Sequence, residues 1–211
     1  MKKNSYTNQV FINCPFDNEY TTSLFKAIVF TIQDCGFIAR CSKEIDNATE
    51  TRLESIINLI DQCKYGVHDL SRVELDEETR LPRFNMPFEL GIFYGAKKFG
   101  KDKKNKSKSC IIFEKEKYSY QKFISDISGI DIKNHDNLPE KIIFAIRNWL
   151  STSSNRITIP HAPLIFSRYE KFYNYFINLC DSQKIDCNSF PFIDLTRNVS
   201  DWLKLNPIES T

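Results

Sequence analysis

The sequence predicts an α/β fold, a parallel sheet with helices on both faces that is followed by a helical C-terminal extension. Short apolar runs of strand length alternate with longer segments in which apolar residues recur at helical spacing. Such alternation is typical of parallel sheets, because the crossover between parallel strands usually contains a helix. The chain has 211 residues, of which 41% are hydrophobic and 17 are Phe, enough for one domain with a sizeable core and an appendage.

Four apolar segments are expected to form the strands: residues 9–13, 37–41, 65–70 and 109–114. Each is a short run bounded by polar or turn-forming residues. The segment 118–132 leaves two alternatives open. The spacing of its aromatic and apolar residues suggests a helix, whereas Ile130-Asp131-Ile132 suggests a short edge strand.

Helices are expected between the strands and after the last one: residues 24–35, a segment that opens near Asn47, 87–98 and 138–150. Gly36 is expected to end the first helix. Asn47 followed by Glu50 resembles a capping box, in which each side chain bonds a backbone N–H of the other residue. Pro87 suits a first helical position, because its missing N–H would have no partner there.

Residues 1–150 are expected to form the α/β domain, and residues 151–211 the helical extension. The composition of Ser151–Asn155 is typical of a linker. An aromatic-rich amphipathic helix is expected over 164–182 and a second, short helix over 199–205. Because about 60 residues make a poor independent core, the extension should pack on the α/β domain or on another subunit.

Composition argues against several classes of function. The formal net charge of +2 does not suggest a dedicated binder of nucleic acid, and the lysine-rich stretch 97–108 is expected to be a solvated loop at the amino edge of the sheet. No apolar run approaches the ~20 residues of a membrane span, and no signal-peptide core follows Met1. We therefore expect a cytoplasmic protein without a membrane partner.

The cysteines and histidines do not suggest a metal site or disulfides. The seven cysteines include no CxxC pair, and most lie in apolar runs. We expect free, buried thiols in a reducing compartment. His135 and His161 are isolated in the sequence, and no histidine has ligand-like spacing, so no metal is expected.

The loops after the first three strands are expected to meet at the carboxyl edge of the sheet, where open α/β proteins bind ligands. The first loop holds Pro15, Phe16 and Asp17, which lack a glycine-rich phosphate fingerprint and equally suit a simple turn. The second strand leads to Arg40 and Glu44. Arginine offers a bidentate fork to phosphate or carboxylate, although these charges equally suit a structural ion pair. The convergence predicts a small-molecule site.

Two carboxylates are the strongest candidates for chemistry. Asp69 ends the third strand, where it could hold a ribose hydroxyl or cap local backbone N–H groups, and His68 should point to the opposite side of the strand. Glu89 is expected in the first turn of the helix that Pro87 opens, where the helix dipole favours an ionised carboxylate. It could instead only stabilise its own helix. An ionised carboxylate near Asp69 suits nucleophilic or electrostatic work on a glycosidic bond.

Three stretches in this order resemble the nucleoside 2-deoxyribosyltransferase-like group, which is related in fold to TIR domains and includes bacterial TIR-like proteins. They are Val10–Phe16, the strand-ending Asp69, and Asn85–Gly91 with Ala96 after it. The resemblance covers residues 8–150. It implies a flavodoxin-like three-layer fold and cleavage of an N-glycosidic bond, with Glu89 as nucleophile or stabiliser, Asp69 as the acidic residue after the third strand, and Pro15 and Phe16 against the base.

The approach to the glutamate, Arg83-Phe84-Asn85-Met86-Pro87, departs from the transferases, which often carry a Gly there. The C-terminal Asn with which some of them complete the site from a neighbouring subunit cannot be placed. The leading interpretation is therefore a TIR-like NAD glycohydrolase or cyclase, with NAD or a nucleotide as substrate and no further cofactor. Arg40 or Arg83 would bind phosphate, and Asn85 and Met86 would contact the substrate.

This interpretation implies a bacterial defence effector that forms a homo-oligomer, in which the extension would suit assembly-dependent activation. A nucleoside 2-deoxyribosyltransferase is the first alternative. A non-catalytic module that senses a nucleotide or scaffolds partners is the second.

Overall fold

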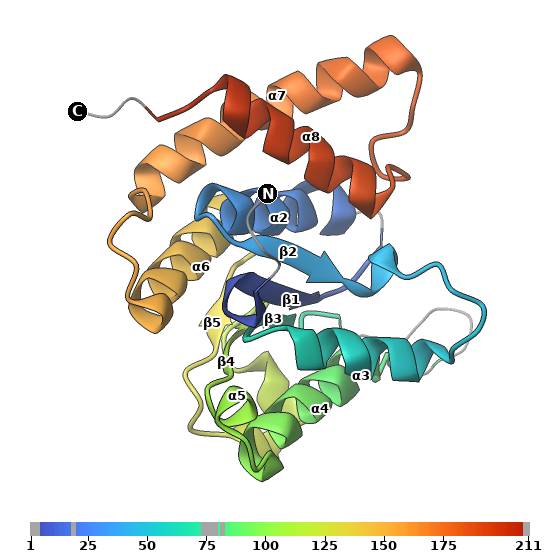
Figure 1. Cartoon of the computed structure of the whole chain (residues 1–211), viewed down its shortest axis with the longest axis vertical. Coiled ribbons are helices and arrows are strands. Elements are labelled where there is room, and N and C mark those ends of the chain that lie inside the picture. Colours follow the sequence, from blue (N-terminus) through green and yellow to red (C-terminus); the bar gives the residue numbers. More distant parts are fainter. Residues whose placement is uncertain (1–4, 18–19, 73–79, 81–82, 209–211) are drawn as a thin grey trace.

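The computed structural model describes residues 5–17, 20–72, 80 and 83–208. Its sheet has five strands in the order β2-β1-β3-β4-β5, and every adjacent pair is parallel. The strands are β1 (Gln9–Asn13), β2 (Ile38–Cys41), β3 (Tyr65–Asp69), β4 (Ser109–Glu114) and β5 (Lys133–Asn134). Helices cover both faces (Figure 1). The predicted flavodoxin-like three-layer fold with a helical C-terminal extension is confirmed.

One face of the sheet is covered by α3 (Arg52–Gln62) and α4 (Asn85–Phe99), which pack on a small cluster around Phe11 and Phe93. The other face is covered by η2 (Thr21–Phe25), α2 (Lys26–Asp34) and α6 (Pro139–Ser154). Short connecting elements complete the described part of the chain: η1 (Tyr6–Asn8), η3 (Ser42–Glu44), α5 (Lys103–Lys106), η4 (Ser119–Lys122) and η5 (Ser125–Ile127).

The extension forms α7 (Ala162–Gln183) and α8 (Phe192–Leu205), which lie across the outer side of α2 (Figure 1). The Phe30 ring of α2 stacks on Phe172 of α7 at 5.2 Å and meets Trp202 of α8 edge-on at 5.7 Å. Arg168 of α7 pairs with Asp34 at 3.0 Å. Because these helices share one hydrophobic core with the sheet domain, the extension is packed on the domain, which is one of the two arrangements expected.

Several predicted boundaries were wrong. The capping box of α3 is formed by Thr51 and Glu54, while the Asn47 side chain accepts a bond from the Thr49 N–H. The expected linker 151–155 is largely helical, since α6 continues to Ser154. Residues 118–132 form two short 3-10 turns, and the edge strand follows at 133–134. Helix α8 starts at Phe192, seven residues before the predicted Val199.

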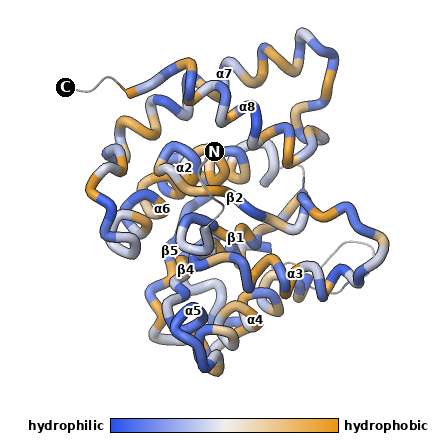
Figure 2. The backbone as a smooth tube through the Cα atoms, in the orientation of Figure 1, coloured by the Kyte–Doolittle hydropathy of each residue, from blue (hydrophilic) through white to orange (hydrophobic). Residues whose placement is uncertain are grey.

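The lysine-rich stretch is also more ordered than expected. Lys103–Lys106 form α5, and the Asp102 side chain caps its start by accepting from the Asn105 N–H. Lys108 is fully buried, and its Nζ donates to the carbonyls of Ile60 at 2.7 Å and Cys63 at 2.6 Å. It thus satisfies carbonyls at the end of α3. Around α5 the stretch is strongly hydrophilic (Figure 2), whereas Phe99 before it is an exposed apolar side chain.

The helices and the cysteines can be compared with two further expectations. Within the described ranges, no helix combines the length and apolar character that a membrane span requires. All seven cysteines are free, and five of them are buried: Cys14, Cys35, Cys41, Cys63 and Cys180. The expectation that most cysteines serve as buried core residues is confirmed.

Candidate functional site

The site candidates gather at the carboxyl edge of the sheet, next to the point where the strand order reverses between β1 and β3. The last residue of β1, Asn13, lies beside His68 of β3. Asn13 Nδ2 donates to the Met86 carbonyl at 2.8 Å and to His68 Nδ1 at 3.1 Å. These bonds tie the start of α4 to the two central strands. In open α/β sheets this edge is the usual place for a ligand.

Asp69 is the centre of a buried hydrogen-bond network. Its side chain is inaccessible to solvent. Oδ1 accepts from the backbone N–H of Ser71 at 2.8 Å and from the Ser71 hydroxyl, and Oδ2 accepts from Tyr20 Oη at 2.5 Å and lies 3.1 Å from His135 Nε2. Burial alone would raise the pKa of Asp69, but the His135, Ser71 and Tyr20 donors hold it below its ordinary value. Neither oxygen is left for a ribose.

Ser71, His135 and Asp69 are the residue types of a hydrolytic triad, but their geometry differs from one. A triad needs the acid on Nδ1 and the serine on Nε2 of the same imidazole. Here Nε2 faces both Ser71 Oγ, at 2.7 Å, and Asp69 Oδ2, whereas Nδ1 accepts from the Asn137 N–H at 2.9 Å. Since Nδ1 is an acceptor, the proton lies on Nε2, and no basic nitrogen of the imidazole faces the hydroxyl. The network is therefore structural.

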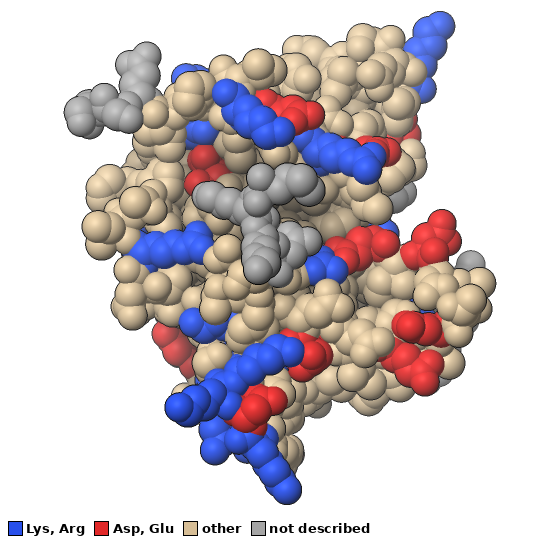
Figure 3. All heavy atoms as spheres, in the orientation of Figure 1, with Lys and Arg blue, Asp and Glu red and all other residues tan. Residues whose placement is uncertain are grey.

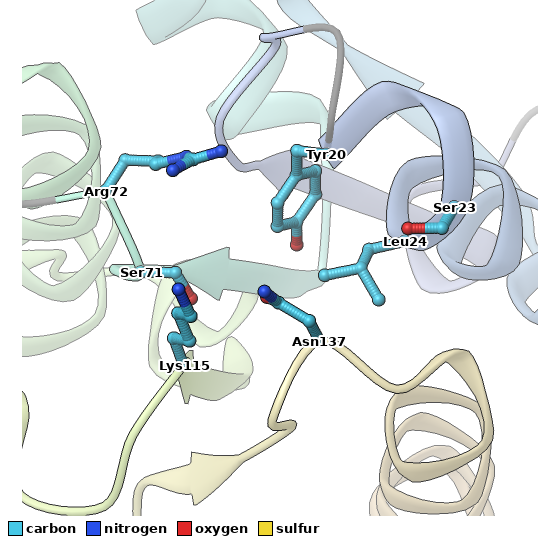
Figure 4. A pocket seen from close by; sticks show the side chains of 7 residues that line it. All are labelled: Tyr20, Ser23, Leu24, Ser71, Arg72, Lys115 and Asn137. Carbon is cyan, nitrogen blue, oxygen red and sulfur yellow. The ribbon is translucent and has the colours of Figure 1, made fainter.

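A small cavity adjoins this network (Figure 4). It is lined by side chains from the chain segment after β1 and from the loops after β3, β4 and β5: Tyr20, Ser23, Leu24, Ser71, Arg72, Lys115 and Asn137. Its volume is about 30 Å³, room for roughly one or two water molecules. Ligand pockets usually measure about 300–1,000 Å³, so this cavity does not hold a nucleotide.

Glu89 lies further along its helix than predicted. Helix α4 begins at Asn85, and its first backbone bond runs from Phe88 N–H to the Phe84 carbonyl at 2.9 Å. Pro87 is thus the third helical residue, where an N–H still has no intrahelical partner, so the proline fits. Glu89 is the fifth residue and lies outside the first turn. The expectation that the helix dipole keeps it ionised was therefore wrong, since that effect fades within one turn.

The Glu89 carboxylate is instead governed by burial. Burial raises the pKa of Glu89 to about 7, although the nearby Arg52 cation lowers it. Among the residues that the structure describes, none forms a hydrogen bond or an ion pair with this carboxylate. A half-buried carboxylate without a partner is unusual in a folded protein, and one that titrates near neutral pH is a candidate for function.

Electrostatic and ring interactions link groups from four segments in a chain that includes Glu89, and we call Cys14, Phe16, Lys43, Arg52 and Glu89 the Glu89 cluster. Arg52 begins α3 and acts on the Glu89 carboxylate. Burial raises the pKa of the Cys14 thiol. The Asp69 and Glu89 carboxylates raise this pKa further, whereas the Lys43 cation lowers it. Both candidate carboxylates, Asp69 and Glu89, therefore influence the pKa of the same thiol. Lys43 Nζ also lies over the Phe16 ring, 4.8 Å from its centroid. The cluster combines one carboxylate, two cations and an aromatic ring.

The other predicted site residues have varied surroundings. Asp17 pairs with Arg72 at 2.9 Å and accepts from the Tyr20 N–H at 3.0 Å. Arg40 forms a bidentate pair with Glu44, which is the structural ion pair weighed as an alternative. Both line an open groove of about 400 Å³ beside α3 that does not include Glu89.

The remaining predicted contacts flank the start of α4 or the turn after β1. Pro15 and Met86 are buried. Arg83 and Asn85 are exposed. Three residues in the turn after β1 were predicted to contact the substrate: Pro15, Phe16 and Asp17. Of these, only Phe16 belongs to the Glu89 cluster.

His68 lies on the opposite side of β3 from Asp69, as predicted. Its ring packs edge-on against Phe93 at 5.0 Å and Phe11 at 6.0 Å, and burial lowers its pKa to about 3. The imidazole is therefore neutral. Its Nε2 has no hydrogen-bond partner among the described residues, and the packing against Phe93 places an aromatic ring near this N–H group.

Sequence reasoning missed Tyr20, His135 and Lys43, and it did not connect Arg52 with Glu89. Tyr20 lies 49 residues before Asp69 in the sequence, and His135 follows β5. Both side chains nevertheless contact Asp69. No local spacing connects such residues. Lys43 follows β2 directly, so the rule that ligands bind at the carboxyl edge could have drawn attention to it.

No protein-family model matches this chain, and no curated protein sequence matches it.

Proposed function

We propose that this protein cleaves the N-glycosidic bond of NAD or a related nucleotide, with Glu89 as the catalytic carboxylate. One observation carries the proposal. The Glu89 carboxylate is half-buried at the ligand edge of the sheet, has no partner among the described residues, and has its pKa raised to about 7. A carboxylate kept unpaired can serve as nucleophile or electrostatic stabiliser at an oxocarbenium-like centre.

In the proposed reaction, the bond between ribose C1′ and the base nitrogen breaks, and its electron pair leaves with the base. Glu89 stabilises the positive C1′ or bonds to it, and water then supplies the hydroxyl group and releases a proton. Lys43 and Arg52 of the Glu89 cluster would attract the phosphates, since both are cations within the same group of residues. Phe16 offers an aromatic face for a base.

Asp69 has a different part in this proposal from the one first considered. Since both of its oxygens already accept hydrogen bonds, we assign it a positioning role in which it holds the loops after β1, β3 and β5 together. Such an activity suits a defence effector that depletes a nucleotide.

The test is nicotinamide release from NAD by the purified protein, followed at several protein concentrations. Wild type is expected to release nicotinamide, and Glu89→Gln to lose at least about 100-fold in rate without a fall in melting temperature. Glu116→Gln is the matched control, because Glu116 is an exposed carboxylate and its loss should leave the rate unchanged. Equal release by wild type and Glu89→Gln would refute the role of Glu89.

Two further outcomes identify the alternatives. Exchange of bases between thymidine and adenine, without NAD cleavage, would indicate a nucleoside deoxyribosyltransferase. Thermal stabilisation by nucleotides without any turnover would indicate a sensing module.

A further inference from the structure

Two cysteines of the C-terminal extension lie next to each other. Cys180 is in the last turn of α7 and is fully buried, whereas Cys187 lies in the connection between α7 and α8 and is half-buried. Their side chains form a hydrogen bond, and both pack in the same hydrophobic core. Because both thiols are free, the fold holds two reduced sulfur atoms close together.

The course of the backbone brings the two cysteines together. Lys184 ends α7 in the left-handed conformation, with φ 55°. The N–H of Ile185 then donates to the Cys180 carbonyl at 3.0 Å, which is the Schellman arrangement of a helix end. A second turn follows, in which the N–H of Ser189 donates to the Asp186 carbonyl at 3.0 Å. The contact between the thiols therefore rests on two hydrogen-bonded turns.

The connection between α7 and α8 is seated on the sheet domain. Thr22 Oγ1 donates to Asn188 Oδ1 at 2.8 Å. Phe192, the first residue of α8, packs on Phe25 with the ring centroids 5.9 Å apart. Since Thr22 and Phe25 both belong to η2, the segment that carries Cys187 is held between α7 and the sheet domain.

A buried lysine lies beside the two thiols. Lys26 is fully buried, and its Nζ donates to the Thr21 carbonyl at 2.9 Å. Burial lowers the pKa of Lys26, whereas the two cysteines and Asp186 raise it. Burial raises the pKa of Cys180, a hydrogen bond to Cys187 raises it further, and the Lys26 cation lowers it. A cation near a thiol favours the thiolate, which is the reactive form.

The outer surface of α8 has a different character (Figure 3). It carries charges of both signs, since Arg197 pairs with Asp194 at 3.3 Å and Lys204 with Asp201 at 2.7 Å. The two thiols instead face the core that joins the extension to the sheet domain. A covalent link between them would therefore act on this internal packing and not on the charged surface.

We propose that Cys180 and Cys187 are a site of reversible oxidation, at which hydrogen peroxide converts the two thiols into a disulfide. The more accessible Cys187 attacks one peroxide oxygen as a thiolate. The O–O bond breaks, and the other oxygen leaves as hydroxide and takes up the thiol proton to become water. Cys187 then carries a sulfenic acid.

The second step forms the disulfide. The Cys180 sulfur attacks the Cys187 sulfur, the S–O bond breaks, and the hydroxyl group leaves with the Cys180 proton as a second water. Each sulfur gives up one electron, and the peroxide takes up both. This inference does not depend on the chemistry of Glu89.

The first test is peptide mapping of the full chain after treatment with hydrogen peroxide and alkylation of the remaining thiols. Trypsin cuts between the two cysteines at Lys184, so a disulfide joins the peptides Phe172–Lys184 and Ile185–Arg197. Wild type is expected to give this linked product, which lacks two hydrogen atoms and separates on reduction. Cys187→Ser should lose it entirely.

Cys110→Ser is the matched control. Cys110 is the other half-buried cysteine, and it packs against the clusters beneath α3 and α4, on the opposite face of the sheet from the extension. Its replacement should leave the yield of the linked product unchanged. A wild type without the linked product would overturn the proposal, as would a product that Cys187→Ser still forms.

The second test asks whether the native fold accommodates the link and which thiol reacts first. The disulfide shortens the free chain of the unfolded state, so oxidation should raise the melting temperature of wild type by about 5 °C and that of Cys187→Ser not at all. In Cys180→Ala the sulfenic acid on Cys187 has no thiol to condense with, and dimedone should trap it. A lower melting temperature on oxidation, or no trapped sulfenic acid in Cys180→Ala, would contradict the proposed site.

Discussion

The Asp69 network and the Glu89 cluster place two carboxylates at the same edge of the sheet in opposite situations. Asp69 is fully buried and accepts hydrogen bonds on both oxygens, so its pKa lies below the ordinary value. Glu89 is only partly buried, has no partner among the described side chains, and has a pKa of about 7. The two differ both in depth and in the donors around them.

The contrast indicates which carboxylate is available for chemistry. A buried charge is tolerated when donors surround it, and such a group holds structure together. A carboxylate that is desolvated without donors costs stability, and it gains by binding a cationic centre such as an oxocarbenium-like ribose. Three variants test the contrast, in order of decreasing effect.

The largest effect is expected from Asp69→Ala. The substitution leaves the donors of Tyr20, Ser71 and His135 buried without their acceptor, which should lower the free energy of unfolding by about 3–5 kcal/mol. Urea unfolding measures this loss. Asp17→Ala is the control, since the Asp17–Arg72 pair is partly exposed and should contribute less than about 1 kcal/mol. Similar losses in both variants would contradict a special role for the Asp69 network.

A smaller effect is expected in the pH dependence of stability. The pKa of Glu89 is raised from 4.5 to about 7 in the folded protein, so between these values the native state binds more protons than the unfolded state. Stability from this group should therefore fall as the pH rises through this window, by about 1–2 kcal/mol after allowing for partial exposure. Glu89→Gln should remove this part of the slope, whereas Glu116→Gln should retain it. Parallel curves for wild type and Glu89→Gln would show that Glu89 is well solvated.

The smallest effect is expected from Arg52→Met. Because the Arg52 cation lowers the pKa of Glu89, its removal should shift that pKa upward by less than about one unit. Titration of the Glu89 carboxyl carbon by NMR measures the shift directly, without any enzymatic assay. Arg40→Met should leave it unchanged, since Arg40 is paired with Glu44. A shift of the same size in both variants would mean that only overall charge matters.

Much of the fold could be predicted from sequence, because strands and helices follow from local periodicity. The strands at 9–13 and 109–114 match the structure residue for residue. Helix ends were harder, since Asn47 and Thr51 both begin capping-box patterns and only the folded chain selects Thr51. The start of α4 was predicted at Pro87 but lies at Asn85. Proline is tolerated throughout the first turn of a helix, so it does not fix the first residue.

The order of apolar runs was enough to predict the parallel sheet and the loops that meet at its carboxyl edge. It also placed Asp69 and Glu89 near that edge. Which carboxylate is surrounded by donors followed from the folded chain alone, because Tyr20 and His135 reach Asp69 from distant parts of the sequence. Desolvation and hydrogen bonding depend on neighbours in space, and these shift the pKa of Asp69 downward and that of Glu89 upward.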